Sequence, residues 1–303
     1  MSIEDAVVAL RRGELVAFPT ETVYGLGADA GNSRAVARVY AAKGRPHFNP
    51  LIAHVLNVAD AEAHALLHPT AHALAETFWP GPLTLVAPRR AASSVCDLAC
   101  AGLSTIAVRA PSHPIARDLI AAFGAPIVAP SANRSGHVSA TTAHHVMLDL
   151  GDAVDMILDG GSSDIGLEST IVAVDANGRA TLLRPGAIPR EAIEPLSGVL
   201  ASAKASIEAP GMMASHYAPR ARLRLDVDAP ATGEAFLAFG AEAPAGGLTL
   251  SATGDLVEAA ANLYAHLRAL DASGAPVIAV APIPRQGLGE AIRDRLARAA
   301  APR

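Results

Sequence analysis

Short aliphatic runs bounded by proline or glycine recur along the first two hundred residues of the chain. Examples are "LTLVAP", "STIAVRA" and "PIVAP", and segments with the pattern of amphipathic helices lie between such runs. Runs of this length predict buried strands. Because 51% of the residues are hydrophobic and only 4% are aromatic, the core must consist mainly of alanine, valine, leucine and isoleucine. Aliphatic strands covered by alanine-rich helices indicate an α/β fold.

Two regions of different character follow one another, with a short segment between them. Residues 1–200 carry mixed helix and strand signals that indicate one sheet, and its first strand is expected at 14–18. Residues 201–221, rich in small side chains and with two prolines, predict a linker. Residues 222–303 predict a small α/β domain with a long amphipathic helix in "DLVEAAANLYAHLRALDASG". In the first domain, helices are expected over 2–13, 33–44, 58–67, 70–79, 113–124 and 140–150.

The bulk properties argue against a membrane protein and a secreted protein. No uninterrupted apolar run reaches the length of a membrane span, and "MSIEDAVVALRRG" lacks the basic start and long apolar stretch of a signal peptide. Cys96 and Cys100, the only cysteines, are expected to be small apolar side chains rather than a disulfide. These features predict a cytoplasmic protein. The net charge of −5 argues against nucleic-acid binding as the whole function, although it does not exclude a local basic patch.

A glycine-rich turn is expected directly after the strand at 14–18. Its glycines, Gly25, Gly27 and Gly31, have the spacing G-x-G-x-x-x-G, which differs from that of a dinucleotide-binding turn. No acidic residue stands at the end of the next strand to bind a ribose. The chain also lacks the phosphate loop G-x-x-x-x-G-K-[ST]. A protein of this sequence that uses ATP must therefore hold it in another way.

Three hydroxyl side chains, Thr20, Thr22 and Tyr24, lie in the same stretch. Hydroxyls at the carboxyl end of a strand suit a small polar ligand. They could equally cap the segment that follows, and this stretch alone leaves both interpretations open.

Lys43 and Arg45 lie two residues apart just after a predicted helix. Of the 24 lysine and arginine residues, only Lys43 and Lys204 are lysines, so Lys43 could mark a place that needs a compact ammonium group. Two cations in a bend of glycine and proline can converge on one polyphosphate. The alternative is that they stabilise the negative end of the preceding helix.

Small polar residues gather in the loop "APSANRSGHVSATT", which follows a buried strand. Ser131, Asn133 and Ser139 belong to it, and such a loop can bind an anion through hydroxyls and backbone N–H groups. The alternative is a helix cap at Ser139 with the other serines as loop residues. "GLESTIV" repeats the pattern at the start of a strand, with Glu168, Ser169 and Thr170 as its polar residues. Two arginines, Arg109 and Arg184, end other strands.

The sequence gives weak support for a metal site and for covalent catalysis. His64, His68 and His72 are spaced four apart, but Pro69 is expected to interrupt their helix, and no carboxylate or thiolate completes a zinc site. The chain has no G-x-S-x-G nucleophile motif, and neither cysteine lies in a nucleophile setting. No metal-binding side chains are identified.

Seven segments in the first domain together resemble the YrdC-type threonylcarbamoyl-AMP synthases in their longer, two-domain form. The resemblance continues through "PGMMASHYAP" into "GLGEAIRDRLARAA", so it covers nearly the whole chain. One such motif would be weak, but seven in register are very specific. The seven are "FPTETVYGLGADA", "KGRPHFNPL", "WPGPLTLV", "STIAVRAPSHPIA", "PIVAPSANRSG", "GLESTIV" and "LLRPGAI".

The resemblance implies a fold, a reaction and a site. The fold would be a twisted mixed sheet with a concave cavity, followed by a Rossmann-like α/β domain. The reaction would convert L-threonine, bicarbonate and ATP to threonylcarbamoyl-AMP and pyrophosphate, for the threonylcarbamoyladenosine modification of tRNA. The implied ATP residues are Lys43, Arg45, Thr105, Asn133, Ser139, Arg184 and Tyr217, with Lys43 and Arg45 as catalytic candidates and Thr105 between the two ligands. The implied threonine residues are Thr20, His54, Arg109, Ser131, Ser169 and Thr170.

Such a site would need Mg²⁺ with the ATP, positioned cations and little covalent help from the protein. The linker, with His216 and Tyr217, would close over the nucleotide and exclude water. His54 is the candidate general base. Relatives often carry a lysine and an arginine in the linker motif where this chain has Met213 and Ser215, so the lid would supply less charge.

Two other functions stay open at this point. One is an RNA-binding module, since domains of this type have a basic concavity, but the acidic net charge and the shortage of aromatic residues argue against it. The other is a carbamoyltransferase that uses carbamoyl phosphate. The larger carbamoyl-handling proteins carry zinc-finger modules, for which this chain has no cysteine pairs. The product would pass to the tRNA-modifying machinery, and direct binding of tRNA is left undecided.

Overall fold

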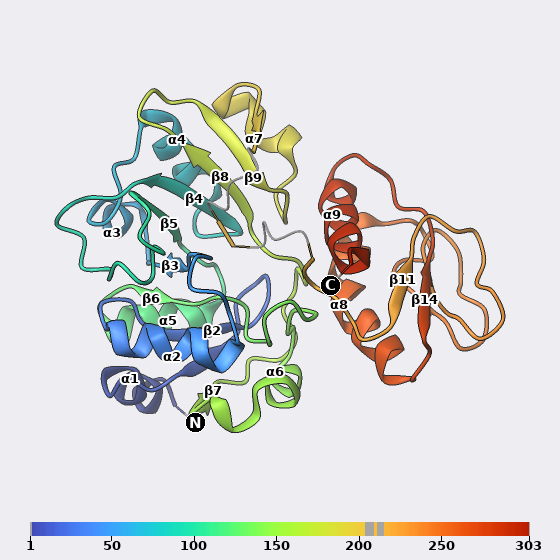
Figure 1. Ribbon diagram of the computed structural model, residues 1–303. Helices are drawn as coiled ribbons and strands as arrows, with labels where there is room; N and C mark the ends of the chain where they lie inside the picture. The colour runs from blue at the N-terminus through green and yellow to red at the C-terminus, as the bar shows by residue number, and fades with distance from the viewer. Residues whose placement is uncertain (1, 204–208, 211–214, 303) are drawn as a thin grey trace.

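Two sheets organise the chain, as the computed structural model in Figure 1 shows. The structure describes residues 2–203, 209–210 and 215–302. Within these residues, the first sheet contains ten strands, which are, in spatial order, β10 (Ala201–Ser202), β9 (Ala180–Arg184), β8 (Thr170–Val174), β4 (Leu83–Pro88), β5 (Thr105–Arg109), β3 (Ile52–His54), β6 (Ile127–Val128), β2 (Gly25–Asp29), β1 (Val16–Phe18) and β7 (Met156–Ile157). The second contains four, in the order β11 (Arg222–Arg224), β14 (Val277–Val280), β12 (Ala235–Ala238) and β13 (Leu248–Thr249).

Helices cover both sheets. In the first domain they are α1 (Ile3–Arg11), α2 (Ser33–Lys43), α3 (Val58–Glu62), α4 (Pro69–Phe78), α5 (Pro114–Phe123), α6 (Ala143–Leu150), the 3₁₀ turn η1 (Gly151–Ala153) and α7 (Arg190–Ser197). The second domain contributes α8 (Leu256–Ala272) and α9 (Leu288–Ala300). The predicted α/β fold, with mixed order around one sheet and a smaller α/β domain, is confirmed. None of the described helices is both long enough and apolar enough to span a membrane.

Local sequence signals explain where the helices begin and end. Ser2 and Asp5 form reciprocal side-chain to backbone hydrogen bonds that cap α1. Asn32 caps the start of α2, and Gly44 ends it in the left-handed conformation. Pro69 is the first residue of α4 and not an interior break, so it separates α3 from α4 as expected, although α3 ends before the predicted residue 67.

The prediction of a glycine-rich turn directly after β1 was wrong about where the turn lies. Gly25 and Gly27 lie inside strand β2, which pairs antiparallel with β1. A Cβ added to Gly27 would lie 2.7 Å from the ring of Phe18 and 2.9 Å from the carbonyl oxygen of Val16. These glycines therefore permit close packing within a hairpin. The turn itself is the polar segment 19–24.

The face of the first sheet that meets the linker is apolar in its middle. Ile52, Val86, Ala107 and Ile171 come from neighbouring strands and form a buried cluster that includes Ala209 of the linker. The mixed pairing, with β4 antiparallel to β5 but parallel to β8, brings the ends of strands that are far apart in sequence to one edge of this face. The polar site lies at that edge.

The linker predicted at 201–221 begins within the first sheet. Ala201 and Ser202 form β10, which pairs parallel with Thr181 and Leu182 of β9. The sheet therefore extends two residues beyond the predicted end of the first domain, while the division into domains stays a prediction. Met213 lies outside the described residues.

The second domain rests against the first through its two helices. Its four-stranded sheet is parallel throughout, and Figure 1 shows α8 and α9 on the side of this sheet that faces the first domain. Gly166 has φ of +66°, and a Cβ there would lie 2.6 Å from the carbonyl oxygen of Ala261 in α8. Glycine at this position thus lets α8 approach the segment that leads into β8.

Candidate active site

Strand ends of the first sheet and the linker enclose a small cavity of about 40 Å³. β3, β5 and β9 each contribute their last residue, and the loop after β6 and the segment before β8 complete that wall. The linker forms the opposite wall. Residues that line the cavity are Thr22, Val23, Arg45, Ile52, His54, Arg109, Ala129, Pro130, Ser131, Glu168, Ser169, Arg184, Pro210, His216 and Tyr217.

Arg109, the last residue of β5, forms a buried ion pair in the wall of this cavity. Its Nη2 donates to Oε1 of Glu21 at 2.7 Å, and its Nη1 donates to Oγ1 of Thr22 at 3.0 Å. Burial alone would raise the pKa of Glu21, but Arg109 holds it below the usual value, so this carboxylate is ionised. Glu21 therefore holds the guanidinium in place, and Nε of Arg109 is buried without a partner among the described residues.

His54, the last residue of β3, is neutral. Its Nδ1 lies 3.2 Å from the carbonyl oxygen of Ile52, so Nδ1 carries the proton and Nε2 can accept a hydrogen bond. Burial, followed by the charge of Arg109, lowers the pKa of His54 to about 3. A group with so low a pKa is a weak proton acceptor. This argues against the general-base role considered for His54 and favours a hydrogen-bonding role.

Lys43 and Arg45 lie on the same side of the site but have different surroundings. Lys43 Nζ donates to the carbonyl oxygens of Ser131 and Asn133, which places it behind that loop and outside the cavity lining. Burial, followed by Arg45, lowers its pKa. Arg45 lines the cavity, and its guanidinium donates to the carbonyl oxygens of Asn49 and Pro50. Burial lowers the pKa of Arg45 to about 10, so it remains cationic at neutral pH.

The loop from Ser131 to Ser139 is held by its own polar side chains. Nδ2 of Asn133 donates to the carbonyl oxygens of Arg134 and His137 at 2.8 and 2.9 Å, and Oδ1 of Asn133 is buried without a partner among the described residues. Ser131 lines the cavity. The hydroxyl of Ser139 donates to Oε1 of Glu168 at 2.5 Å.

Arg184, at the end of β9, connects this edge of the sheet to the linker. Its guanidinium donates to the carbonyl oxygen and to Oγ of Ser169, at 2.9 and 3.2 Å, and to the carbonyl oxygen of Pro210 at 3.2 Å. Nε of Arg184 is buried without a partner among the described residues. Thr170, beside Ser169, uses its hydroxyl to donate to the carbonyl oxygen of Ile188 at 2.7 Å.

The linker enters the cavity through His216 and Tyr217. Their rings stack with centroids 4.1 Å apart, and Tyr217 also stacks on Tyr264 of α8. Tyr217 has φ of +60°, an uncommon conformation for a bulky residue, which occurs where the surroundings demand it. Burial, followed by Arg45, lowers the pKa of His216 to about 3, so its imidazole is neutral.

Unsatisfied polar atoms surround the cavity. A buried polar atom without a hydrogen bond costs roughly 1–3 kcal/mol, so native proteins contain few of them. Their concentration at one place indicates that a polar ligand supplies the missing partners. Among the described residues, the buried polar atoms without a partner at or beside this cavity are Arg109 Nε, Asn133 Oδ1, Arg184 Nε, His216 Nδ1, Tyr217 OH and Arg295 Nη2.

The residues predicted from the sequence fall into three groups. Arg45, His54, Arg109, Ser131, Ser169, Arg184 and Tyr217 line the cavity. Thr20, Lys43, Asn133, Ser139 and Thr170 are buried directly beside it, through the hydrogen bonds given above or adjacency in the chain. Thr105 shares a face of β5 with Arg109 but begins the strand, about 13 Å away at the usual rise per residue.

In the segment 19–24, Thr20 fits the interpretation as a local cap, and Thr22 fits the interpretation as a ligand-facing hydroxyl. Oγ1 of Thr20 donates to the carbonyl oxygen of Val23 at 2.7 Å and accepts from the backbone N–H of Thr22, so it holds its own turn together. Thr22 lines the cavity instead. The structure thus favours Thr22 over Thr20 as the ligand-facing hydroxyl of this stretch, and direct contact of Thr20 with threonine stays a prediction.

The sequence analysis did not single out Glu21 or Arg295, and it named Glu168 among the polar residues of "GLESTIV" without giving it a role in the site. Glu21 lies inside the motif "FPTETVYGLGADA", and Glu168 inside "GLESTIV", so an acidic residue among hydroxyls was a usable signal in both cases. Arg295 gave no such signal. It lies 127 residues from Glu168 and reaches the site only because α9 packs against the first domain.

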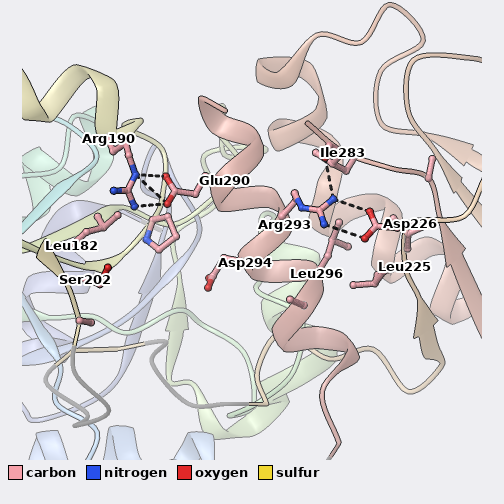
Figure 2. Close-up of a pocket in the computed structure, with 15 residues that line it drawn as sticks. Leu182, Arg190, Ser202, Leu225, Asp226, Ile283, Glu290, Arg293, Asp294 and Leu296 are labelled. Carbon is pink, nitrogen blue, oxygen red and sulfur yellow. Dashed lines mark hydrogen bonds and ion pairs between the residues drawn. The ribbon is translucent and has the colours of Figure 1, made fainter. Parts of the chain in front are cut away.

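A larger cavity of about 450 Å³ lies between the two domains and differs in chemistry (Figure 2). Each arginine that lines it is paired with an acid, Arg190 with Glu290 at 2.6 Å and Arg293 with Asp226 at 2.7 Å. These pairs leave no uncompensated positive charge for a polyphosphate. The smaller cavity, with three arginines in its lining, is therefore the better candidate for an anionic ligand.

Both parts of the chain match known family models. Residues 8–186 match the Sua5/YciO/YrdC model, described as "Telomere recombination", and residues 188–301 match "Threonylcarbamoyl-AMP synthase, C-terminal domain". A threonylcarbamoyl-AMP synthase of Pyrococcus abyssi is 42% identical over 96% of this chain and 91% of its own. The chain belongs to the two-domain threonylcarbamoyl-AMP synthase family. A Bacillus subtilis member is 39% identical over 98% of this chain and 92% of its own length.

Solved structures agree with this family membership. The crystal structure of P. abyssi Sua5 complexed with L-threonine has a TM-score of 0.90 and 39% identity, and the match covers 98% of this chain and 94% of that one. Escherichia coli YciO covers 61% of this chain with a TM-score of 0.54 and 22% identity, which shows a shared fold alone. The Sua5-type family is thus shown by sequence and by structure over nearly the whole chain.

Proposed function

We propose that this protein is a threonylcarbamoyl-AMP synthase that converts L-threonine, bicarbonate and ATP to threonylcarbamoyl-AMP and pyrophosphate. One observation carries the proposal: residues from separate motifs converge on one buried cavity with three arginines and several unsatisfied polar atoms. Relatives that match nearly the whole chain are named threonylcarbamoyl-AMP synthases, and one was solved with L-threonine. These relatives support threonine as a substrate here.

The reaction proceeds in three steps. Bicarbonate takes up a proton and loses water to give CO₂. The amino nitrogen of threonine forms an N–C bond with CO₂ and loses a proton, which gives a carbamate. A carbamate oxygen then attacks the α-phosphorus of ATP, the bond to the bridging α–β oxygen breaks, and pyrophosphate leaves. Such a transfer depends on positioning and on stabilisation of charge. Fixed arginines suit both tasks, because their partners within the protein already orient them.

Threonine is expected at the Arg109 end of the cavity. Arg109 Nε lacks a partner among the described residues and can donate to the threonine carboxylate. Thr22 and Ser169 line the same cavity with hydroxyls that are bonded to Thr20 and Thr84, and neutral His54 can accept a hydrogen bond through Nε2. Hydroxyl partners for the threonine side chain would reject alanine and valine, since buried polar groups would then be left unpaired.

ATP is expected on the side of Arg45 and Arg184, with Lys43 behind the loop at Ser131 and Asn133. No group of three or more histidine, cysteine, aspartate or glutamate side chains suited to a metal is found in the described part of the chain. Mg²⁺ commonly binds through substrate phosphates and water, so we propose that it arrives with the triphosphate and offsets its charge there.

The cavity is too small for these ligands in this conformation. It encloses about 40 Å³, whereas sites for ligands of this size occupy roughly 300–1,000 Å³. Pro210, His216 and Tyr217 form its linker wall. We therefore propose that the linker moves outward to admit ATP and closes again, which protects the carbamate from water. The unstable product would then pass to the tRNA-modifying machinery of the cytoplasm.

Pyrophosphate release, with each component omitted in turn, tests the proposal. The expected result is release that requires ATP, threonine, bicarbonate and Mg²⁺ together, with an acid-labile adduct that contains carbon from labelled bicarbonate. Release without threonine, or carbamoyl phosphate consumed in place of bicarbonate, would count against a synthase. Binding of RNA without any pyrophosphate release would favour the RNA-binding alternative.

A further inference from the structure

Glu168 is a buried carboxylate whose partners come from both domains. Its Oε1 accepts from the Ser139 hydroxyl at 2.5 Å, within the first domain. Its Oε2 accepts from the Tyr264 hydroxyl of α8 at 2.6 Å and from Nε of Arg295 in α9 at 2.8 Å. Glu168 also lines the cavity and directly precedes Ser169. Glu168 thus links the candidate site to two helices of the second domain, beside the bonds that Arg268 of α8 donates to the carbonyl oxygens of Val138 and Ser139.

Arg295 is the principal cation that compensates Glu168. Its side chain is fully buried, and its guanidinium carbon lies 5.0 Å from the ring centroid of Tyr217 in the linker. Burial alone would raise the pKa of Glu168, but Arg295, together with Arg184, lowers it to about 2. Glu168 is therefore ionised, and without Arg295 a buried negative charge would lose its closest cation.

The bond to Glu168 sets what Ser139 can offer to a ligand. An ionised carboxylate can only accept, so the Ser139 hydroxyl donates its proton to Glu168. Its lone pairs remain available for a donor of the ligand, such as an amino group of a base or a ribose hydroxyl. The direction in which the Ser139 hydroxyl donates therefore depends on Glu168, while Arg268 of α8 holds the Ser139 backbone through its carbonyl oxygen.

We propose that Arg295 of the second domain is a positioning residue for nucleotide binding in the first domain. It holds Glu168, which in turn orients Ser139, and it packs on Tyr217 at the linker wall of the cavity. This inference rests on the proposed function in that the nucleotide is taken to be ATP. It gives the second domain a role in the reaction beyond support of the linker.

Arg295→Met is the first test, with Arg190→Met as the matched control. Both changes remove an arginine that bridges the domains, but Arg190 pairs with Glu290 at the separate, larger cavity (Figure 2). We expect Arg295→Met to raise the Kd of ATP by calorimetry, and the KM for ATP, about tenfold or more, with kcat changed less than threefold. Arg190→Met should change both by less than twofold. Arg295→Lys, which keeps the charge, should recover part of the affinity.

A double-mutant cycle with Glu168→Gln separates positioning from general support of the fold. If Arg295 acts through Glu168, Glu168→Gln weakens ATP binding as Arg295→Met does, and the double variant binds ATP no more weakly than the poorer single variant. Where Arg295→Met does not fold, the double variant is compared with Glu168→Gln directly, because Glu168→Gln removes the buried charge and Asp294 keeps Arg298 as a partner. Equal ATP affinities, both weaker than that of the wild type, support the proposal, and wild-type affinity in both variants contradicts it.

Three outcomes would overturn it. The first is an ATP affinity of folded Arg295→Met within twofold of the wild type. The second is that the losses of ATP affinity in the double-mutant cycle are additive. The third is a loss of ATP affinity in Arg190→Met equal to that in Arg295→Met. Failure of the proposed function is distinguishable, because it would appear in the wild-type protein as ATP binding without pyrophosphate release in the presence of threonine and bicarbonate. The comparison of ATP affinities decides the role of Arg295 in either case.

Discussion

Two buried arginines at the site form hydrogen bonds with other protein groups, but one polar atom of each arginine is left without a hydrogen bond among the described residues. Arg109 is paired with Glu21, and Arg184 is bonded to Ser169 and Pro210, yet Nε of each arginine lacks a partner among the described residues. A donor that is already oriented loses little conformational freedom when a ligand arrives. The site is therefore prepared for anionic groups.

The Glu21–Arg109 pair allows structural and binding roles to be separated. Arg109→Met leaves Glu21 buried without its cation and should lower the free energy of unfolding by about 3–5 kcal/mol. The double variant Glu21→Gln, Arg109→Met should recover much of that stability, because no charge is left uncompensated. It should still bind threonine roughly a hundredfold more weakly, as measured by calorimetry. Wild-type threonine affinity in the double variant would remove Arg109 from the substrate site.

His54 predicts a particular dependence of stability on pH. The pKa of His54 is about 3 in the folded protein, against about 6.5 for an ordinary histidine, so the unfolded chain binds a proton more readily. The contribution of His54 to the free energy of unfolding is therefore complete above the pKa of histidine in the unfolded chain and is lost as pH falls from about 6.5 towards 3. Between about pH 7.5 and about pH 5.5 the loss should be roughly 1 kcal/mol.

Chemical denaturation at these two pH values, for the wild type and for His54→Gln, measures this contribution. Between these two pH values, the free energy of unfolding of His54→Gln should fall by roughly 1 kcal/mol less than that of the wild type. An equal pH dependence in both proteins would show that His54 is not buried as a neutral imidazole.

The family resemblance, rather than any local pattern, implied site roles for Arg45, Arg109 and Arg184, and all three line the cavity. Arg109 and Arg184 end strands, and Arg45 follows α2. The sequence did not reveal the protein partners of these side chains. Pairings such as Arg295 with Glu168 depend on how two domains dock, and no local pattern in the sequence encodes that. Thr20 and Thr22 were indistinguishable because both carry the same group, and only the turn geometry separates them.

At the scale of elements, the hairpin β1–β2 and the turn between these strands position one wall of the cavity. The turn carries Glu21 and Thr22, so its placement depends on how closely the two strands pair. Apolar runs bounded by proline or glycine correctly predicted strands. The glycines of β2 were misassigned to a turn, because glycine is typical both of turns and of close strand packing.

Gly27→Ala tests this close packing. The new Cβ would meet the Phe18 ring at 2.7 Å and the Val16 carbonyl oxygen at 2.9 Å, so we expect a loss of about 2–3 kcal/mol in the free energy of unfolding. Addition of Phe18→Leu should recover only part, since the backbone oxygen of Val16 remains. Thermal and denaturant unfolding measure both variants, and a Gly27→Ala protein as stable as the wild type would contradict the packing described.

At the scale of the whole molecule, the first domain and the linker line one small cavity, and the second domain packs behind it. The first domain supplies the sheet edge, the linker supplies His216 and Tyr217, and the second domain contacts Glu168 through Arg295. Both the fold class and the presence of a second domain followed from sequence. The family resemblance implied a linker that closes over the site, but the contacts of Pro210, His216 and Tyr217 that close this cavity could not be predicted, because they depend on how separate parts of the chain pack.

A crystal structure with L-threonine and an ATP analogue bound is the most direct measurement of the central claim. We predict the threonine carboxylate at Arg109, the phosphates beside Arg45 and Arg184, and the linker residues displaced from their present positions. The amino nitrogen should face the α-phosphate across the space that CO₂ would occupy. Either ligand found outside this cavity, or both bound too far apart for a shared reaction, would contradict the account.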